Sequence, residues 1–290
     1  MLLGYNTNGL AHHDLFDAVA LLADIGYRSV AITIDHLALP PLAGFYRQKV
    51  ERLRRLLEKR QMRSVIETGA RFLLDPRLKH EPTLVSRERS GRQRRLDFYK
   101  YAVDTAAALG SDCVSLWSGS LPQHVQRGAS RSLPKNVERD EAMQWLVDGL
   151  RQTVEYAAGR HATIGFEPEP GMLIDSMARW EDLLAQPGLE DLCLTLDVGH
   201  LHCQGEGPID QVIHHWAPRL VNVHIEDMRA GVHEHLMFGD GEIDFPAVLR
   251  GLSAVGYVGG VHVELSRHSH EGPTAAKRAY DFLQGVLQGL

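Results

Sequence analysis

The chain has 290 residues, of which 44% are hydrophobic and 23% charged, so it can bury a large core, and we expect one domain over residues 1–290. Its 31 basic and 37 acidic residues give a net charge of −6, which argues against a nucleic-acid binder. One stretch, residues 87–95, is basic, and we predict that it forms a solvated loop and the start of a helix. The three cysteines (Cys113, Cys193 and Cys203) have no disulfide spacing, and the N-terminus shows neither a signal peptide nor a transmembrane span. We therefore expect a cytoplasmic protein without nucleic-acid or membrane partners.

Short apolar runs alternate with segments of helical period eight times along the chain. The predicted strands cover residues 2–8, 29–35, 64–69, 113–119, 163–169, 192–198, 220–227 and 259–266. The predicted helices cover residues 13–27, 45–61, 96–110, 140–159, 177–186, 209–217, 245–257 and 274–288. Near-continuous apolar strands, each followed by a helix and without a nucleotide-binding glycine fingerprint, predict an α/β fold, a single (β/α)8 TIM barrel.

Two predicted connections are long, from about residue 69 to 93 and from about 118 to 140. Both follow the carboxyl end of a strand, so we expect both to overhang the barrel mouth, where barrel enzymes carry their sites. Glycine and serines in residues 124–136 are typical of a mobile lid, although ordinary surface loops have the same composition.

Polar side chains end four successive predicted strands: Glu167, Asp197, His224 and Glu264. A single one of them would more often be a structural hydrogen-bonding residue than a ligand. Four from consecutive strands converge at the barrel mouth, where unpaired carboxylates would repel one another. The pattern therefore predicts a divalent cation, Mn²⁺, Mg²⁺, Co²⁺ or Zn²⁺, bound by these four residues.

Five segments resemble the xylose isomerase-like barrel superfamily, which includes sugar phosphate isomerases and epimerases as well as endonuclease IV. They are "FEPEPG", "LDVGHLH", "VNVHIED", "FGDGEIDF" and "GVHVELS", and the resemblance covers nearly the whole chain. It implies the same four metal ligands, Glu167, Asp197, His224 and Glu264. It further implies that Glu167 and Glu264 are catalytic, one removing and one returning a proton beside a substrate carbonyl while the cation stabilises an enediolate.

The same resemblance leaves two roles open for three histidines, His200, His233 and His235. In sugar epimerases of the family, a histidine at the offset of His200 contacts the substrate, and His235 would then do so as well. In endonuclease IV, the corresponding positions bind an additional zinc. A second cation is therefore an alternative, although three histidines depart from the family pattern and favour substrate contact.

Further candidates for binding a small sugar-like substrate follow other strands. Arg71 and Arg267 suit an anionic group, with an ion pair to a neighbouring carboxylate as the equal alternative. Glu67 could contact hydroxyl groups, and Trp117 could pack on a sugar face or belong to the barrel core. Weaker candidates end the first, second and fifth strands: Asn6, Asn8, Asp35, His36 and Glu169.

The predicted function is a divalent-metal-dependent isomerase or epimerase of a sugar, keto-sugar or cyclitol. A dehydratase acting on a related polyol or keto substrate could use the same site. An endonuclease IV-like phosphodiesterase is disfavoured by the negative charge, and a barrel that binds a metabolite without turnover is disfavoured by the intact ligand set. Exposed helix faces leave room for a homo-oligomer, but no motif identifies an interface.

Overall fold

The computed structural model describes residues 1–41, 46–121 and 135–290, with side chains omitted for residues 135–138. Nearly all of the predicted lid, residues 124–136, lies outside the described residues, so its role stays a prediction. None of the described helices is long and apolar enough to cross a bilayer.

Eight parallel strands form a closed barrel in the order β1-β10-β7-β6-β5-β4-β3-β2, which confirms the predicted α/β TIM barrel. The order follows the chain around the ring because each parallel strand needs a crossover back to the same end of the barrel. The barrel strands are β1 Leu2–Asn6, β2 Ser29–Thr33, β3 Arg63–Glu67, β4 Val114–Leu116, β5 Ile164–Phe166, β6 Cys193–Asp197, β7 Leu220–Ile225 and β10 Gly260–Val263.

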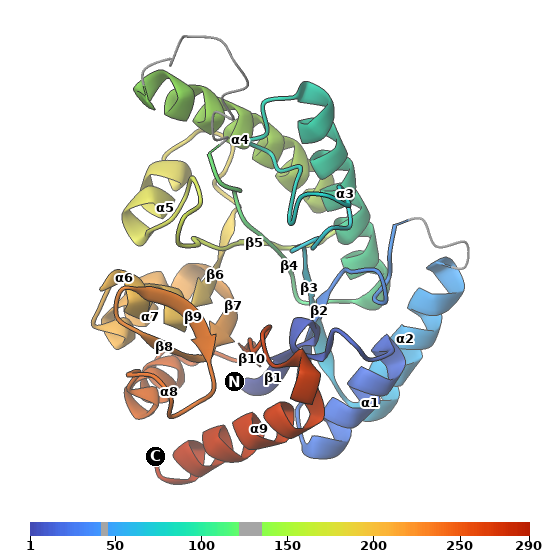
Figure 1. The fold of residues 1–290 in the computed structure, drawn as a ribbon, viewed down its shortest axis with the longest axis vertical. Coiled ribbons are helices and arrows are strands. Elements are labelled where there is room, and N and C mark those ends of the chain that lie inside the picture. The colour runs from blue at the N-terminus through green and yellow to red at the C-terminus, as the bar shows by residue number, and fades with distance from the viewer. Residues whose placement is uncertain (42–45, 122–134) are drawn as a thin grey trace.

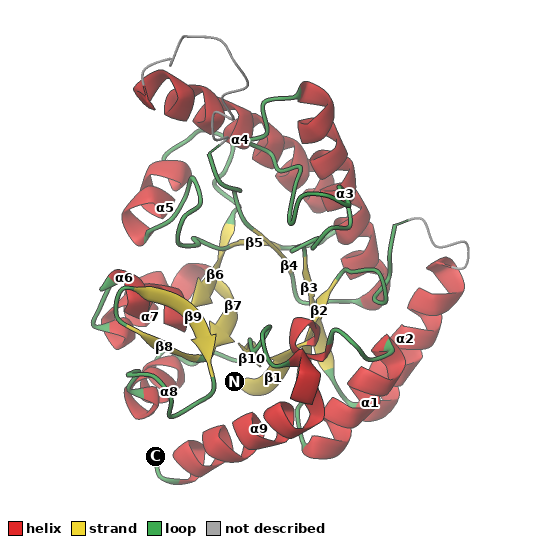
Figure 2. Cartoon of the chain, in the orientation of Figure 1, coloured by secondary structure: helices red, strands yellow, loops and turns green. Residues whose placement is uncertain are grey.

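Helices surround the barrel on its outer side (Figure 1), and the strands lie inside this ring of helices (Figure 2). The described helices are α1 Leu15–Ile25, α2 Tyr46–Arg60, α3 Arg89–Leu109, α4 Lys135–Ala158, α5 Met177–Leu184, α6 Val198–Gln204, α7 Ile209–Trp216, α8 Phe245–Ala254 and α9 Gly272–Gln288. Three 3-10 helices join them: η1 Thr7–Leu10, η2 Ala217–Arg219 and η3 Ser269–Glu271.

Local sequence signals account for the ends of these helices. The side chain of Asp14 accepts a hydrogen bond from the Phe16 amide and caps α1. At the C-terminal end of α3, Gly110 takes the left-handed conformation, with φ of 69°, which is typical of a glycine C-cap. Leu15, Val19 and Leu22 are buried on one face of α1, so the helix packs on the barrel through its apolar stripe.

Two elements near the mouth differ from the prediction. The short helix α6 follows β6 directly, where no helix was predicted, and it carries Cys203. A hairpin of β8 (Asp227–Arg229) and β9 (Val232–Leu236) follows β7. Neither element was predicted from the sequence. Helix α6 is shorter than two turns, so it shows no helical period, and the centre of β9 alternates histidine with glutamate rather than polar with apolar residues. Helices α3 and α4 also begin earlier than predicted, at Arg89 and Lys135.

Candidate active site

The four predicted ligands gather at the carboxyl ends of four neighbouring strands. Asp197 ends β6 and His224 lies on β7, while Glu167 and Glu264 directly follow β5 and β10. One ligand atom from each lies within 4.8 Å of the corresponding atom of every other. The barrel topology causes this convergence, because the carboxyl ends of its parallel strands all open on the same face.

His224 is the centre of this cluster. Its Nδ1 lies 3.2 Å from Glu167 Oε1, 3.0 Å from Glu264 Oε2 and 3.9 Å from Asp197 Oδ2. The side-chain amide of Asn8 donates to Glu264 Oε1 over 2.7 Å, which orients that carboxylate. One nitrogen of the imidazole therefore faces all three carboxylates.

The other nitrogen of His224 faces Glu67, at the end of β3 on the opposite side of the barrel. His224 Nε2 lies 2.9 Å from Glu67 Oε1, which also accepts a hydrogen bond from the Asn222 amide over 3.0 Å. The sequence predicted that Glu67 contacts substrate; the structure places it both on the cavity wall and directly behind His224. A carboxylate in this position orients a histidine ligand and selects its tautomer.

The buried charges compete with one another. Burial raises the pKa of Glu167 to about 8, against the opposing effect of His224, and burial raises the pKa of Glu169 to about 7. Burial opposes ionisation of Glu264 as well, yet the neighbouring His224 lowers the pKa of Glu264 below its usual range. Burial therefore disfavours the ionised forms of Glu167 and Glu169 when no cation is bound.

The donor set fits a divalent cation. Asp197 Oδ2 is buried and has no hydrogen-bond partner among the described residues, although it lies within the ligand cluster. An unpaired buried carboxylate oxygen is costly unless a proton or a cation satisfies it. Three carboxylates and one imidazole are the mixed oxygen and nitrogen ligands that Mn²⁺, Co²⁺ and Zn²⁺ accept.

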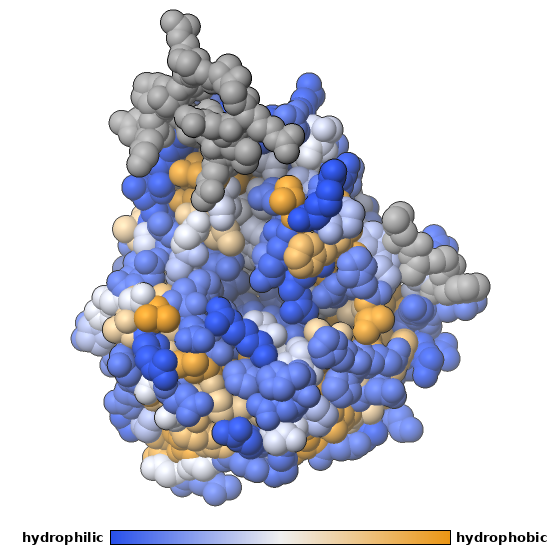
Figure 3. Space-filling model, viewed as in Figure 1, coloured by the Kyte–Doolittle hydropathy of each residue, from blue (hydrophilic) through white to orange (hydrophobic). Residues whose placement is uncertain are grey.

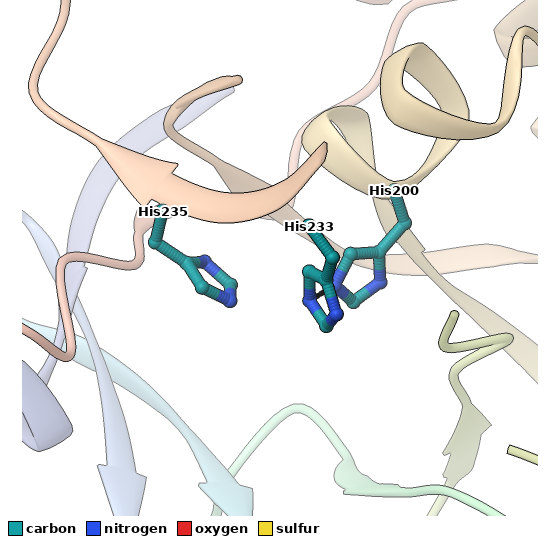
Figure 4. Close-up of side chains that lie close together, drawn as sticks. All are labelled: His200, His233 and His235. Carbon is teal, nitrogen blue, oxygen red and sulfur yellow. Dashed lines mark hydrogen bonds between the residues drawn. The ribbon is translucent and has the colours of Figure 1, made fainter. Parts of the chain in front are cut away.

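Three histidines lie beside this cluster (Figure 4). His200 extends from α6, and His233 and His235 extend from β9 into the same space. The Nε2 atoms of His200 and His233 are 3.0 Å apart, and ligand atoms of all three lie within 4.8 Å of one another. Burial lowers the pKa of His200 to about 4, so this ring stays neutral and its unprotonated nitrogen can accept a hydrogen bond or bind a cation.

A cavity of about 330 Å³ opens over both clusters. The other predicted substrate residues line it: Glu67, Arg71, Trp117 and Arg267. Arg71 also pairs with Asp35 over 3.1 Å, and Arg267 pairs with Glu234 over 3.1 Å, so both arginines form the ion pairs that were the alternative. The face shown in Figure 3 is hollowed near its centre and largely hydrophilic around the hollow, as suits a polar substrate.

Some lining residues were not among the predicted ones. Lys79 and His80 reach the cavity from the connection between β3 and α3, and Ser266 reaches it from the segment after β10. The only sequence signal for Lys79 and His80 was the length of their connection, which was predicted to overhang the mouth. Which of its side chains face inward depends on an irregular backbone that has no period to analyse.

Residues 19–286 match the model of the xylose isomerase-like TIM barrel family. Among curated proteins, L-ribulose-5-phosphate 3-epimerase UlaE of Escherichia coli is 24% identical over 247 residues, which cover 82% of this chain and 81% of that protein. The UlaE protein of Shigella boydii is 24% identical over 234 residues, covering 78% of this chain and 77% of that protein. The relatives therefore align over most of the barrel.

Solved structures share the fold at lower identity. The 3-keto-D-glucoside 4-epimerase YcjR of E. coli superimposes with a TM-score of 0.75 at 16% identity, covering 98% of this chain and 99% of that one. The IOLI protein with a bound zinc atom has a TM-score of 0.74 at 18% identity, covering 100% of this chain and 99% of that one. With a family match over most of its length, the chain belongs to the xylose isomerase-like TIM barrel family.

Proposed function

We propose that this protein is a divalent-cation-dependent isomerase or epimerase of a small keto-sugar. The observation that carries the proposal is the cluster of Glu167, Asp197, His224 and Glu264, whose ligand atoms lie within 4.8 Å of one another beneath a polar cavity. The epimerase names of the relatives, among them L-ribulose-5-phosphate 3-epimerase and 3-keto-D-glucoside 4-epimerase, support epimerisation over dehydration or phosphodiester cleavage.

The chemistry divides between the cation and the two glutamates. When bound, the cation would supply positive charge that makes the C–H next to the substrate carbonyl more acidic. Glu167 and Glu264 follow strands on either side of β6 and β7, so their carboxylates approach the cavity from different sides. One of them removes the proton, and the other returns a proton to the same or the neighbouring carbon.

The surrounding side chains orient the sugar. His200 and His235 line the cavity next to the proposed cation ligands and can donate hydrogen bonds to, or accept them from, sugar hydroxyls. Trp117 is 7% exposed and offers an apolar face on the cavity wall. Arg71, Lys79 and Arg267 place positive charge at the cavity, which favours a substrate carrying an anionic group.

We separately propose that His200, His233 and His235 bind a second cation. Their ligand atoms lie within 4.8 Å of one another, which supports this role. Elemental analysis of protein loaded with Mn²⁺, Co²⁺ or Zn²⁺ decides between the two roles of these histidines. One ion per chain supports substrate contact, whereas two ions, one of them lost on His233→Ala, support the second cation.

Solvent exchange tests the proposed reaction. In D₂O, with ketopentoses, ketohexoses and their phosphates as the panel, the cation-loaded protein should place deuterium on the carbon next to the carbonyl. Glu167→Gln and Glu264→Gln should each slow this exchange by about 100-fold or more, since each removes a group that transfers a proton. The cation content of each variant is measured alongside, so that exchange is compared per bound ion.

Glu58→Gln, an exposed change on α2, is the matched control and should exchange at the wild-type rate. Turnover without deuterium incorporation would replace proton transfer by a hydride shift. Loss of water from the substrate would instead identify the dehydratase, and no turnover of any panel sugar by the cation-loaded protein would contradict the proposal.

A further inference from the structure

A buried run of hydrogen bonds crosses the barrel interior and ends at His224. Ser29 Oγ lies 2.8 Å from His262 Nε2, and His262 Nδ1 lies 2.8 Å from Asn222 Oδ1. Asn222 Nδ2 donates to Glu67 Oε1 over 3.0 Å, and the same oxygen lies 2.9 Å from His224 Nε2. We call Ser29, His262, Asn222 and Glu67 the core chain.

The chemistry of its members gives the core chain one direction. Asn222 Oδ1 can only accept, so His262 donates from Nδ1, and Nε2 of the neutral ring accepts from the Ser29 hydroxyl. The opposite amide orientation of Asn222 would place its oxygen against the Glu67 carboxylate, which repels it. Asn222 therefore donates to Glu67. Its Nδ2 also lies 3.2 Å from His224 Nε2, but Glu67 Oε1 lies closer to that nitrogen, at 2.9 Å, and a lone pair on Nε2 would be repelled by the carboxylate, so Nε2 carries the proton and donates to Glu67.

Two glycines make room for the imidazole of His262. A Cβ added to Gly4 would lie 2.3 Å from His262 Cδ2, and one added to Gly260 would lie 2.2 Å from His262 Cε1. Gly4 pairs with His262 across the β1–β10 ladder, and Gly260 begins β10 itself. A larger residue at either glycine would push the ring out of line with Ser29 and Asn222, because barrel interiors are close-packed.

Every member of the core chain is buried, between 0% and 6% exposed, and each comes from a different strand: β2, β10, β7 and β3. Apolar side chains of similar size are the usual filling of a barrel interior. A polar run that is satisfied from end to end fixes the rotamer and the proton position of each of its members, whereas an apolar filling would fix neither.

We propose that the core chain positions His224, presenting its Nδ1 without a proton to the cation, and that Ser29, His262 and Asn222 are positioning residues for this ligand. The inference rests on the proposed cation site. It extends that site from residues at the barrel mouth to residues that touch neither the cation nor the substrate. Its consequence is that cation affinity depends on Ser29 at the start of β2, the opposite end of that strand from the mouth.

The test compares two substitutions at one position. His262→Leu removes the donor to Asn222, whereas His262→Asn keeps an amide donor close to the position of Nδ1. Competition with a chromophoric chelator gives the Zn²⁺ dissociation constant of wild type and of each variant, and thermal unfolding reports their stability. We expect His262→Leu to weaken Zn²⁺ binding roughly 10- to 100-fold, as found for other partners of metal ligands, and His262→Asn to restore most of it.

A merely structural role would lower the melting temperature of both variants and leave both dissociation constants at the wild-type value, and this result would overturn the inference. If His262→Leu does not fold, Asn222→Ala replaces it in the test, since it removes the side-chain amide that donates to Glu67. Wild-type protein that binds no Zn²⁺, Mn²⁺ or Co²⁺ would overturn the proposed function, and the inference with it. Unchanged Zn²⁺ affinity in the folded variants would overturn the inference alone.

Discussion

At the scale of single residues, Asp227 explains why the "FGDGEIDF" segment lies where it does. This buried carboxylate accepts hydrogen bonds from four backbone amides: those of Met228, Gly239, Gly241 and Ile243, over 2.8 to 3.2 Å. A Cβ at Gly241 would lie 2.3 Å from Asp227 Oδ1, so this glycine is required by the close approach of the backbone. These hydrogen bonds form a structural clamp that holds the segment after the hairpin against the start of β8.

Asp227→Ala should lower the free energy of unfolding by about 3 kcal/mol or more, since four backbone amides, two of them in buried hydrogen bonds, lose a charged acceptor. For a chain of this size, that corresponds to a fall in melting temperature of about 6 °C or more. Differential scanning calorimetry measures it. Asp240→Ala, an exposed change in the same segment, is the control, and equal melting temperatures of the two variants would contradict the clamp.

At the scale of elements, Arg95 on α3 joins that helix to the connection that follows β3. Its guanidinium is buried and donates to the carbonyl oxygens of Thr68, His80 and Pro82. Burial lowers the pKa of Arg95, which is the cost of placing a charge among neutral carbonyls. The three bonds hold the segment that brings Lys79 and His80 to the cavity.

Arg95→Met should loosen the connection between β3 and α3. The cation ligands lie on or directly after β5, β6, β7 and β10, so they should stay in place. We expect limited proteolysis to cleave between residues 69 and 88 faster than in wild type, and KM for the sugar to rise about tenfold or more through lost positioning. Zn²⁺ affinity should not change. Arg55→Met, on the exposed face of α2, should leave all three measurements at their wild-type values. Weaker Zn²⁺ binding in Arg95→Met would show that the segment also supports the ligand cluster.

At the scale of the whole molecule, the proposed cation joins four strands that follow one another in the barrel: β5, β6, β7 and β10. A ligand that binds only the folded chain stabilises it by about 2.7 kcal/mol at 100 times its dissociation constant. Mn²⁺ at that concentration should therefore raise the melting temperature by about 5 °C, and a chelator should reverse the change.

Asp197→Ala should abolish this shift, because it removes a buried carboxylate oxygen, Oδ2, that has no hydrogen-bond partner in the described part of the chain. Asp148→Ala, an exposed change on α4, should keep it. Elemental analysis of both variants provides the ion count. A full melting shift in Asp197→Ala with an undiminished ion count would place the cation elsewhere.

The sequence by itself determined the barrel and the membership of the main cluster. Eight apolar runs, each followed by a helical period, specify parallel strands covered by helices, and parallel strands bring their carboxyl ends to one face. Glu167, Asp197, His224 and Glu264 could therefore be grouped before any contact was known. Each of these four residues ends an apolar run in the sequence, and that run is enough to place it at the end of a strand.

Only the tertiary structure decided which side chains pair with one another around the cavity. Glu67 contacts His224 across the barrel, Arg71 pairs with Asp35, and the hairpin brings His233 to His200. Periodicity shows which face of an element is buried, but it does not show which side chain of another element meets that face. Those pairings depend on the closure of the barrel and on irregular connections, because both juxtapose residues that the sequence separates by dozens of positions.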